Sequence, residues 1–86
     1  MVTKITRKSV CSQVARLLRE ARLQRKLSMT VLAGRAGLSQ QSVSYVEREM
    51  RVPNLDTLLR IANALDLDLS DVIARATKAA VSKNKM

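Results

Sequence analysis

Apolar side chains recur along the first third of the chain with the spacing of a helix rather than a strand. They fall three or four positions apart, which places them on one face of a helix over about residues 9–25. Ser9 or Ser12 is the expected start, because a serine hydroxyl can accept a hydrogen bond from a free N–H of the first turn. The stripe consists of Val10, Val14, Leu17, Leu18 and Ala21.

Two shorter helices are expected next, separated by a turn that contains a glycine. Ser28 is a suitable N-cap for the first of them, and Gly37 can end it, since glycine readily takes the left-handed conformation. Ser39 is the next N-cap, and the helix that follows covers Gln40 to about Glu49. A short helix, a turn of about four residues and a second short helix form a helix-turn-helix. Its inward positions are apolar or small: Leu32, Ala33, Leu38, Val43 and Val46.

A proline separates this pair from two further helices. Pro53 disfavours a helical Val52, and Asn54 is a good N-cap for a helix over Leu55–Leu65. Asp68 can cap a fifth helix, from Leu69 to about Ala80. No strand pattern or internal repeat is present, so the chain is predicted to be an all-α domain of five helices joined by short links.

Composition excludes several classes of function. The chain has 86 residues, no histidine and a single cysteine, which excludes structural zinc, thiol–histidine catalysis and an internal disulfide. No apolar run approaches the ~18 residues of a membrane span, and no signal peptide is recognisable. We therefore expect one small, soluble, cytoplasmic domain that is not an enzyme and that uses no cofactor, metal or small-molecule ligand.

Two groups of side chains could in principle carry chemistry. Asp66, Asp68 and Asp71 could ligate a metal, but an N-cap with first-turn acids explains them better, and a calcium loop needs more ligands and a glycine. Cys11 could be a redox thiol. Its position beside Val10 instead predicts a small, partly buried residue at the edge of the first helix's apolar stripe.

Charge is strongly positive and unevenly spread. The net charge is +9, and residues 1–26 contribute +7 of it, whereas residues 53–73 carry −3. This asymmetry predicts one basic and one non-basic surface, with nucleic acid as the first candidate partner and an anionic membrane surface as the second. Absence of tryptophan and phenylalanine disfavours the membrane alternative. The expected organisation is a basic arm (1–8), a helical domain (9–81) and a basic tail (82–86).

The exposed side of the second helix in the predicted helix-turn-helix carries hydrogen-bonding groups and almost no acid. Glutamines lie at its start, and a glutamine carboxamide can bond adenine N6 and N7 together in the major groove. An ordinary helix corner with a solvated polar face remains the alternative at this point. The basic net charge and the scarcity of carboxylates favour DNA.

Three stretches resemble one family, the lambda-repressor-like helix-turn-helix family of the Cro, phage-repressor and xenobiotic-response-element type. They read RLLREARLQRKLS, VLAGRAGLSQQSVSYVER and RVPNLDTLLRIANALDLDLSDVI, and the resemblance covers Val14–Ile73. It implies a bacterial or phage transcriptional regulator that binds a double-stranded DNA operator as a homodimer, with Gln40–Arg48 as the recognition helix. Such a protein blocks a promoter or touches RNA polymerase. An antitoxin or another protein-interaction module that binds DNA secondarily is the alternative.

The resemblance also implies roles for individual residues. Lys26 stands where the family usually has glycine, so a left-handed Lys26 would cost about 1 kcal/mol. Met29 replaces a usual glutamine and cannot donate to a phosphate, which moves that contact to Thr30. The expected base contacts are Gln40, Gln41, Ser44 and Tyr45, and the expected phosphate contacts are Thr30, Ser42, Arg48, Arg51 and Asn54.

Two further contacts are expected. Periodicity places Arg22 and Glu47 on the inner edges of their helices, and the resemblance places an ion pair there. Dimerisation is expected through the fourth and fifth helices, because their acidic segment is not suited to face DNA and their apolar residues exceed what a small core needs. The predicted interface comprises Leu67, Leu69, Val72, Ile73 and Ala76.

Overall fold

Every regular element in the described part of the chain is helical. The computed structural model describes residues 6–84, with side chains described as far as Val81. Within that range there is no strand, so the prediction of an all-α fold is confirmed. The helices are α1 (Arg7–Gln24), α2 (Met29–Ala36), α3 (Gln40–Glu47), α4 (Leu55–Ala64) and α5 (Leu69–Asn84).

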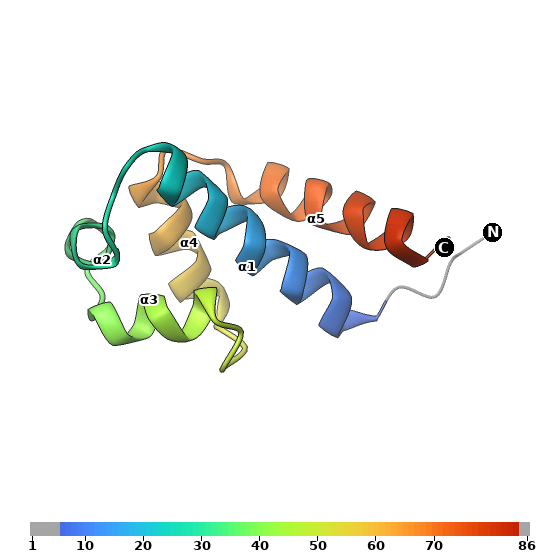
Figure 1. Ribbon diagram of the computed structural model, residues 1–86, viewed down its shortest axis with the longest axis horizontal. Helices are drawn as coiled ribbons and strands as arrows, with labels where there is room; N and C mark the ends of the chain where they lie inside the picture. Colours follow the sequence, from blue (N-terminus) through green and yellow to red (C-terminus); the bar gives the residue numbers. More distant parts are fainter. Residues whose placement is uncertain (1–5, 85–86) are drawn as a thin grey trace.

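The two long helices form a framework for the three short ones. α1 and α5 lie side by side along the 42 Å long axis, and α2, α3 and α4 pack together at one end (Figure 1). One apolar cluster joins all five helices. Burying side chains of this size removes about 1.5–3 kcal/mol of unfavourable hydration each. The largest fully buried side chains are Leu18, Leu32, Val43, Ile61 and Leu65.

Side-chain caps begin the middle helices as the sequence predicts. Ser28 Oγ accepts from the Val31 N–H at 3.0 Å, and Ser39 Oγ accepts from the Ser42 N–H at 3.1 Å. Asn54 Oδ1 accepts from the Thr57 N–H at 2.8 Å. Each bond satisfies a backbone donor that has no partner inside its helix.

Asp68 caps α5 instead of joining a metal cluster. Its Oδ1 accepts from the Ser70 hydroxyl at 2.7 Å and from the Ser70 N–H at 3.0 Å. These bonds favour the ionised carboxylate and lower the pKa of Asp68 below its ordinary value. Asp68 and Asp71 are thereby explained by the start of α5, whereas Asp66 lies at the end of α4.

Both ends of the described chain differ from expectation. Thr6 caps α1, its Oγ1 accepting from the Ser9 N–H at 3.0 Å, so α1 begins at Arg7 rather than near Ser9. Of the expected basic arm, residues 6–8 adjoin or enter α1, and residues 1–5 lie outside the described range. α5 continues to Asn84 instead of ending near Ala80, because no glycine or proline follows to stop it. Residues 82–84 of the expected tail are therefore helical, and 85–86 lie outside the described range.

Four helices end in the same hydrogen-bonded motif. The residue after each helix's last turn is left-handed: Lys26, Gly37, Glu49 and Asp66, with φ of 56°, 71°, 59° and 56°. The following N–H then bonds a carbonyl five residues back, at distances of 2.8–3.1 Å. The left-handed geometry expected of Lys26 is confirmed, and the same geometry at Glu49 ends α3 two residues earlier than predicted. The bonds run from Leu27 to Arg22, Leu38 to Ala33, Met50 to Tyr45 and Leu67 to Ala62.

Lys26→Gly should raise the free energy of unfolding by about 0.5–1 kcal/mol. Glycine removes the left-handed penalty of about 1–2 kcal/mol, and its greater freedom in the unfolded chain takes back part of the gain. Urea denaturation measures the change. Lys78→Gly is the matched control, because that exposed lysine lies inside α5, where glycine should cost about 1 kcal/mol.

Candidate nucleic-acid interface

α3 divides into a buried side and an exposed polar side. Val43 and Val46 are buried in the core cluster, and Glu47 lies beside them on the same side. Gln40 and Gln41 are exposed at the start of the helix, in the two positions that follow the cap Ser39. Ser44 and Tyr45 are half-buried on the same outward side, and Arg48 is exposed just beyond its end. The residues expected to contact bases therefore share one face.

A buried ion pair fixes α3 against α1. Arg22 Nε donates to Glu47 Oε2 at 2.7 Å, and Arg22 Nη2 donates to Glu47 Oε1 at 2.9 Å. Arg22 Nη1 also donates to the Leu27 carbonyl at 2.7 Å. The hydrogen bond to Glu47 is the main cause of a raised pKa at Arg22. The structure thus brings together the two residues that periodicity placed on facing helix edges.

The outward polar side chains of α3 are themselves held by contacts. Gln41 Nε2 donates to Tyr45 Oη at 2.6 Å, and the Arg51 guanidinium lies 4.6 Å from the centroid of the Tyr45 ring. Gln40 Nε2 approaches Met29 Sδ at 3.8 Å, a weak bond to a half-buried sulfur. The sequence gives no periodic signal for the Arg51 contact, because Arg51 lies in the α3–α4 connection.

Of the residues expected at phosphates, Asn54 already serves as a helix cap, and Ser42 bonds to one. Thr30 and Arg51 are exposed, on α2 and on the connection after α3. Ser42 Oγ shares a hydrogen bond with Ser39 Oγ at 2.9 Å. The side-chain oxygen of Asn54 accepts the hydrogen bond that caps α4. The two N–H groups of its carboxamide remain as donors.

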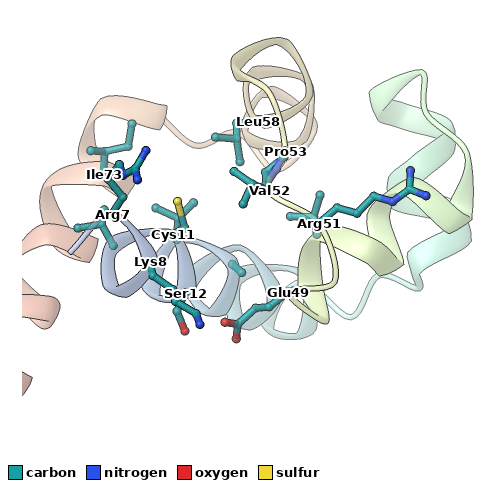
Figure 2. Close-up of a pocket in the computed structure, with 14 residues that line it drawn as sticks. Arg7, Lys8, Cys11, Ser12, Glu49, Arg51, Val52, Pro53, Leu58 and Ile73 are labelled. Carbon is teal, nitrogen blue, oxygen red and sulfur yellow. The ribbon is translucent and has the colours of Figure 1, made fainter.

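An apolar groove lies on another side of the molecule. It has a volume of about 610 Å³ and runs between the start of α1, the α3–α4 connection, α4 and α5 (Figure 2). Val52, Pro53, Leu58 and Ile73 line it, together with Cys11, which is exposed rather than partly buried as predicted. Cys11 is exposed because residues 6–84 leave this end of the α1 stripe uncovered. Arg51 also lines the groove, and Figure 2 shows its guanidinium extending away from Val52 and Pro53.

Most residues of the predicted dimer interface are buried inside the single chain. Leu69, Val72 and Ala76 are 7%, 5% and 0% exposed and belong to the core of the single chain, because α5 turns this face onto its own domain. Leu67 is half-buried against the same core, and only Ile73 is exposed, at 39%. Two apolar side chains that precede this segment are more exposed than Ile73. They are Val52 and Leu55, with exposed fractions of 79% and 61%. The free apolar surface thus centres on the start of α4.

Two structural features bear on the other classes of function. Among residues 6–84, no helix combines the length and apolarity that crossing a membrane requires. In the same range, no three His, Cys, Asp or Glu side chains gather as a metal site would need.

Comparison with known proteins places the chain in a family. The helix-turn-helix family model matches residues 18–72. The chain is 39% identical over 56 residues to the HTH-type transcriptional regulator y4dL of Sinorhizobium fredii, covering 65% of this chain and 29% of the relative. It is 33% identical over 64 residues to the immunity repressor protein of Bacillus phage phi105, covering 74% of this chain and 44% of the relative.

A solved structure agrees on the fold. The crystal structure of a point mutant of the restriction-modification controller protein C.Esp1396I superposes with a TM-score of 0.76 at 20% identity, covering 85% of this chain and 95% of that one. The chain spans less than half the length of each of the two curated relatives it matches. Fold, family model and relatives agree, and the chain belongs to the lambda-repressor-like helix-turn-helix family of transcriptional regulators.

Proposed function

We propose that this chain binds double-stranded DNA sequence-specifically by placing α3 in the major groove. The observation that carries the proposal is the outward face of α3, where exposed glutamines occupy the first two helical positions and no carboxylate faces outward beside them. The first residues of a recognition helix are those that reach base edges. The buried Arg22–Glu47 pair supports the proposal by fixing the orientation of α3.

Affinity comes from phosphates on either side of that helix. Arg48 and Arg51 carry positive charge beyond the end of α3, and Thr30 and Asn54 offer neutral donors at the starts of α2 and α4. Contacts of this kind position the protein without reading sequence. The net charge of +9 gives the chain a favourable electrostatic approach to DNA.

We infer that the protein acts as a homodimer through the apolar face formed by Val52, Pro53, Leu55, Leu58 and Ile73. Val52, Pro53, Leu58 and Ile73 line one groove, and Leu55 lies one turn before Leu58 on α4. Residues 53–73 carry a net charge of −3 in a chain of +9, so α4 and the start of α5 repel a second copy less than the start of α1 does, although Arg7, Lys8 and Arg51 also line the groove. A twofold dimer would present two α3 helices to successive major grooves, about 34 Å apart.

Occupying an operator that overlaps a promoter would make the protein a repressor. The immunity repressor of phage phi105, to which the chain is 33% identical, supports repression as the regulatory outcome. RNA polymerase would be the competitor excluded from such a site, or the partner touched from an adjacent one.

Gln40→Ala and Gln41→Ala should each lower the preference for cognate over random DNA by about 1–3 kcal/mol, because each removes a bidentate base contact. Affinity for random DNA should change little. Arg48→Ala should weaken cognate and random DNA alike and reduce the salt slope by about one unit, since one fewer counterion is released. Competition binding at two salt concentrations, on an operator selected from a random pool, separates the two kinds of variant.

Equal loss of cognate and random affinity in both glutamine variants would show that α3 does not read the bases. The basic N-terminal segment, Lys4 to Lys8, would then be the part of the protein that contacts the bases. The structure describes residues 6–8 of this segment. Salt-sensitive binding without any sequence preference in the wild type would reject a regulator of specific sites altogether.

A further inference from the structure

Tyr45 has two partners that meet on the outward face of α3. Its hydroxyl oxygen accepts a hydrogen bond from Gln41 Nε2 at 2.6 Å, one helical turn away. Its ring lies under the Arg51 guanidinium. The distance from the ring centroid to the guanidinium carbon of Arg51 is 4.6 Å. The tyrosine is half-buried, whereas Gln41 is exposed. Tyr45 therefore connects a candidate base-reading side chain to the Arg51 guanidinium.

The direction of the bond between Gln41 and Tyr45 determines what Gln41 offers to DNA. A carboxamide has two N–H donors and one acceptor oxygen. Giving one N–H to Tyr45 leaves the other N–H beside the oxygen, which matches adenine, with its N7 acceptor and N6 donor. A carboxamide turned by a half-rotation would point its oxygen at Tyr45 and both N–H groups outward. That edge matches guanine, with its N7 and O6 acceptors.

Arg51 and the DNA backbone favour the direction in which Gln41 Nε2 donates to the Tyr45 hydroxyl. A hydroxyl that accepts from Gln41 keeps its own proton, which it can donate to a phosphate oxygen. Hydrogen bonds in such a chain strengthen one another. The cation over the ring withdraws electron density and makes the hydroxyl a better donor, and it also restrains the ring. None of the hydrogen bonds of the described residues uses the Arg51 guanidinium, so its N–H groups remain available for a phosphate.

We propose that Tyr45, held by Arg51, is a positioning residue that fixes the direction of the Gln41 carboxamide and thereby selects adenine over guanine at the base pair that Gln41 reads. The proposal rests on the proposed function, because it requires α3 in the major groove. It assigns Tyr45 an action through Gln41, in place of a base contact of its own. It also gives Arg51 a second role beside its phosphate contact.

Tyr45→Phe tests the proposal, since phenylalanine keeps the ring under Arg51 and removes only the hydroxyl. The operator comes from selection by the wild type, and the base pair read by Gln41 is the one where Gln41→Ala loses its preference. Dissociation constants are measured for operators with A·T or G·C at that pair. We expect the wild type to prefer A·T by about tenfold or more and Tyr45→Phe to prefer it by less than about threefold. Affinity for random DNA should fall by about threefold to tenfold, the loss of one hydrogen bond to a phosphate.

Thr77→Val is the control, because it removes a half-buried hydroxyl on α5, outside the α3 face, and should keep the full preference. Arg51→Met is a second variant that leaves the hydroxyl in place; it should lower the preference partway and reduce the salt slope by about one unit. Thermal unfolding checks that each variant is folded.

Two outcomes overturn the inference and leave the proposed function standing. In one, Tyr45→Phe keeps the full A·T preference at the pair where Gln41→Ala loses it. In the other, the wild type prefers G·C at that pair, which would mean that the carboxamide is turned the other way. A selection that yields no preferred sequence would instead overturn the proposed function, and the inference with it.

Discussion

Glu47→Ala should lower the free energy of unfolding by about 3 kcal/mol and weaken DNA binding at the same time. Glu47 accepts two hydrogen bonds from Arg22, and the two side chains are only 3% and 9% exposed. Removing one partner of a buried pair leaves the other charge desolvated and uncompensated, which costs about 3–5 kcal/mol. Arg22 retains the Leu27 carbonyl, which places the expected cost at the low end. Urea denaturation measures the stability.

The exposed pair Arg16–Glu20 provides the control within the same chain. Its Nε–Oε2 distance is 3.1 Å, but its side chains are 60% and 49% exposed, so solvent screens the attraction. Glu20→Ala should change the free energy of unfolding by no more than about 0.5 kcal/mol. A Glu47→Ala protein as stable as Glu20→Ala would contradict the role assigned to the buried pair.

Loss of DNA binding in Glu47→Ala is separable from loss of fold. At a temperature where the variant remains folded, freeing α3 from α1 should lower cognate affinity more than random affinity. Base contacts require a fixed helix orientation, whereas phosphate contacts tolerate adjustment. Equal losses on both DNAs would show that the pair stabilises the fold without orienting α3.

Helix starts could be predicted from the sequence, and helix ends less well. Ser28, Ser39 and Asn54 begin their helices because capping is a local bond between a side chain and an N–H two or three residues on. Glu49 and Asp66 are left-handed residues at the ends of α3 and α4. Neither is a glycine, so the sequence does not mark these helix ends with one. The available signal is the apolar residue that follows each end: Leu27, Leu38, Met50 and Leu67.

The candidate DNA-binding face was predictable for a related reason. Val43 and Val46 identify the buried side of α3, so Gln40 and Gln41 are outward by helical periodicity alone. The contact of Arg51 with Tyr45 was not predictable, because it depends on the path of the irregular α3–α4 connection.

The residues predicted for dimerisation on α5 are mostly buried, because periodicity identifies an apolar stripe without showing what covers it. Leu69, Val72 and Ala76 form such a stripe on α5, and the domain's own core covers it. Val52 precedes Pro53 outside any helix, so no periodic pattern marks it, yet it is 79% exposed. Only the folded chain shows which apolar residues remain free.

Leu55→Glu should convert a dimer into a folded monomer and lower operator affinity by about 100-fold. Leu55 is 61% exposed, so a charge there should leave the folded chain intact while placing two carboxylates in a twofold interface. Joining two DNA-binding units raises the effective concentration of the second, which multiplies affinity by about 10²–10⁴. A monomer loses that gain, and its affinity for a single half-site should be unchanged. Sedimentation at micromolar concentrations gives the oligomeric state, and gel shifts on full and half operators give the affinities.

Leu23→Glu is the control, because Leu23 is 49% exposed near the end of α1 and does not belong to the apolar face of the proposed interface. It adds the same charge and should remain a dimer. A wild type that sediments as a monomer and binds the full operator no more tightly than a half-site would reject dimerisation through this face. If Leu55→Glu and Leu23→Glu both stay dimeric, the interface lies elsewhere, since a carboxylate at the centre of an apolar twofold contact would face its own copy across the axis. The comparison therefore separates the existence of a dimer from the surface that forms it.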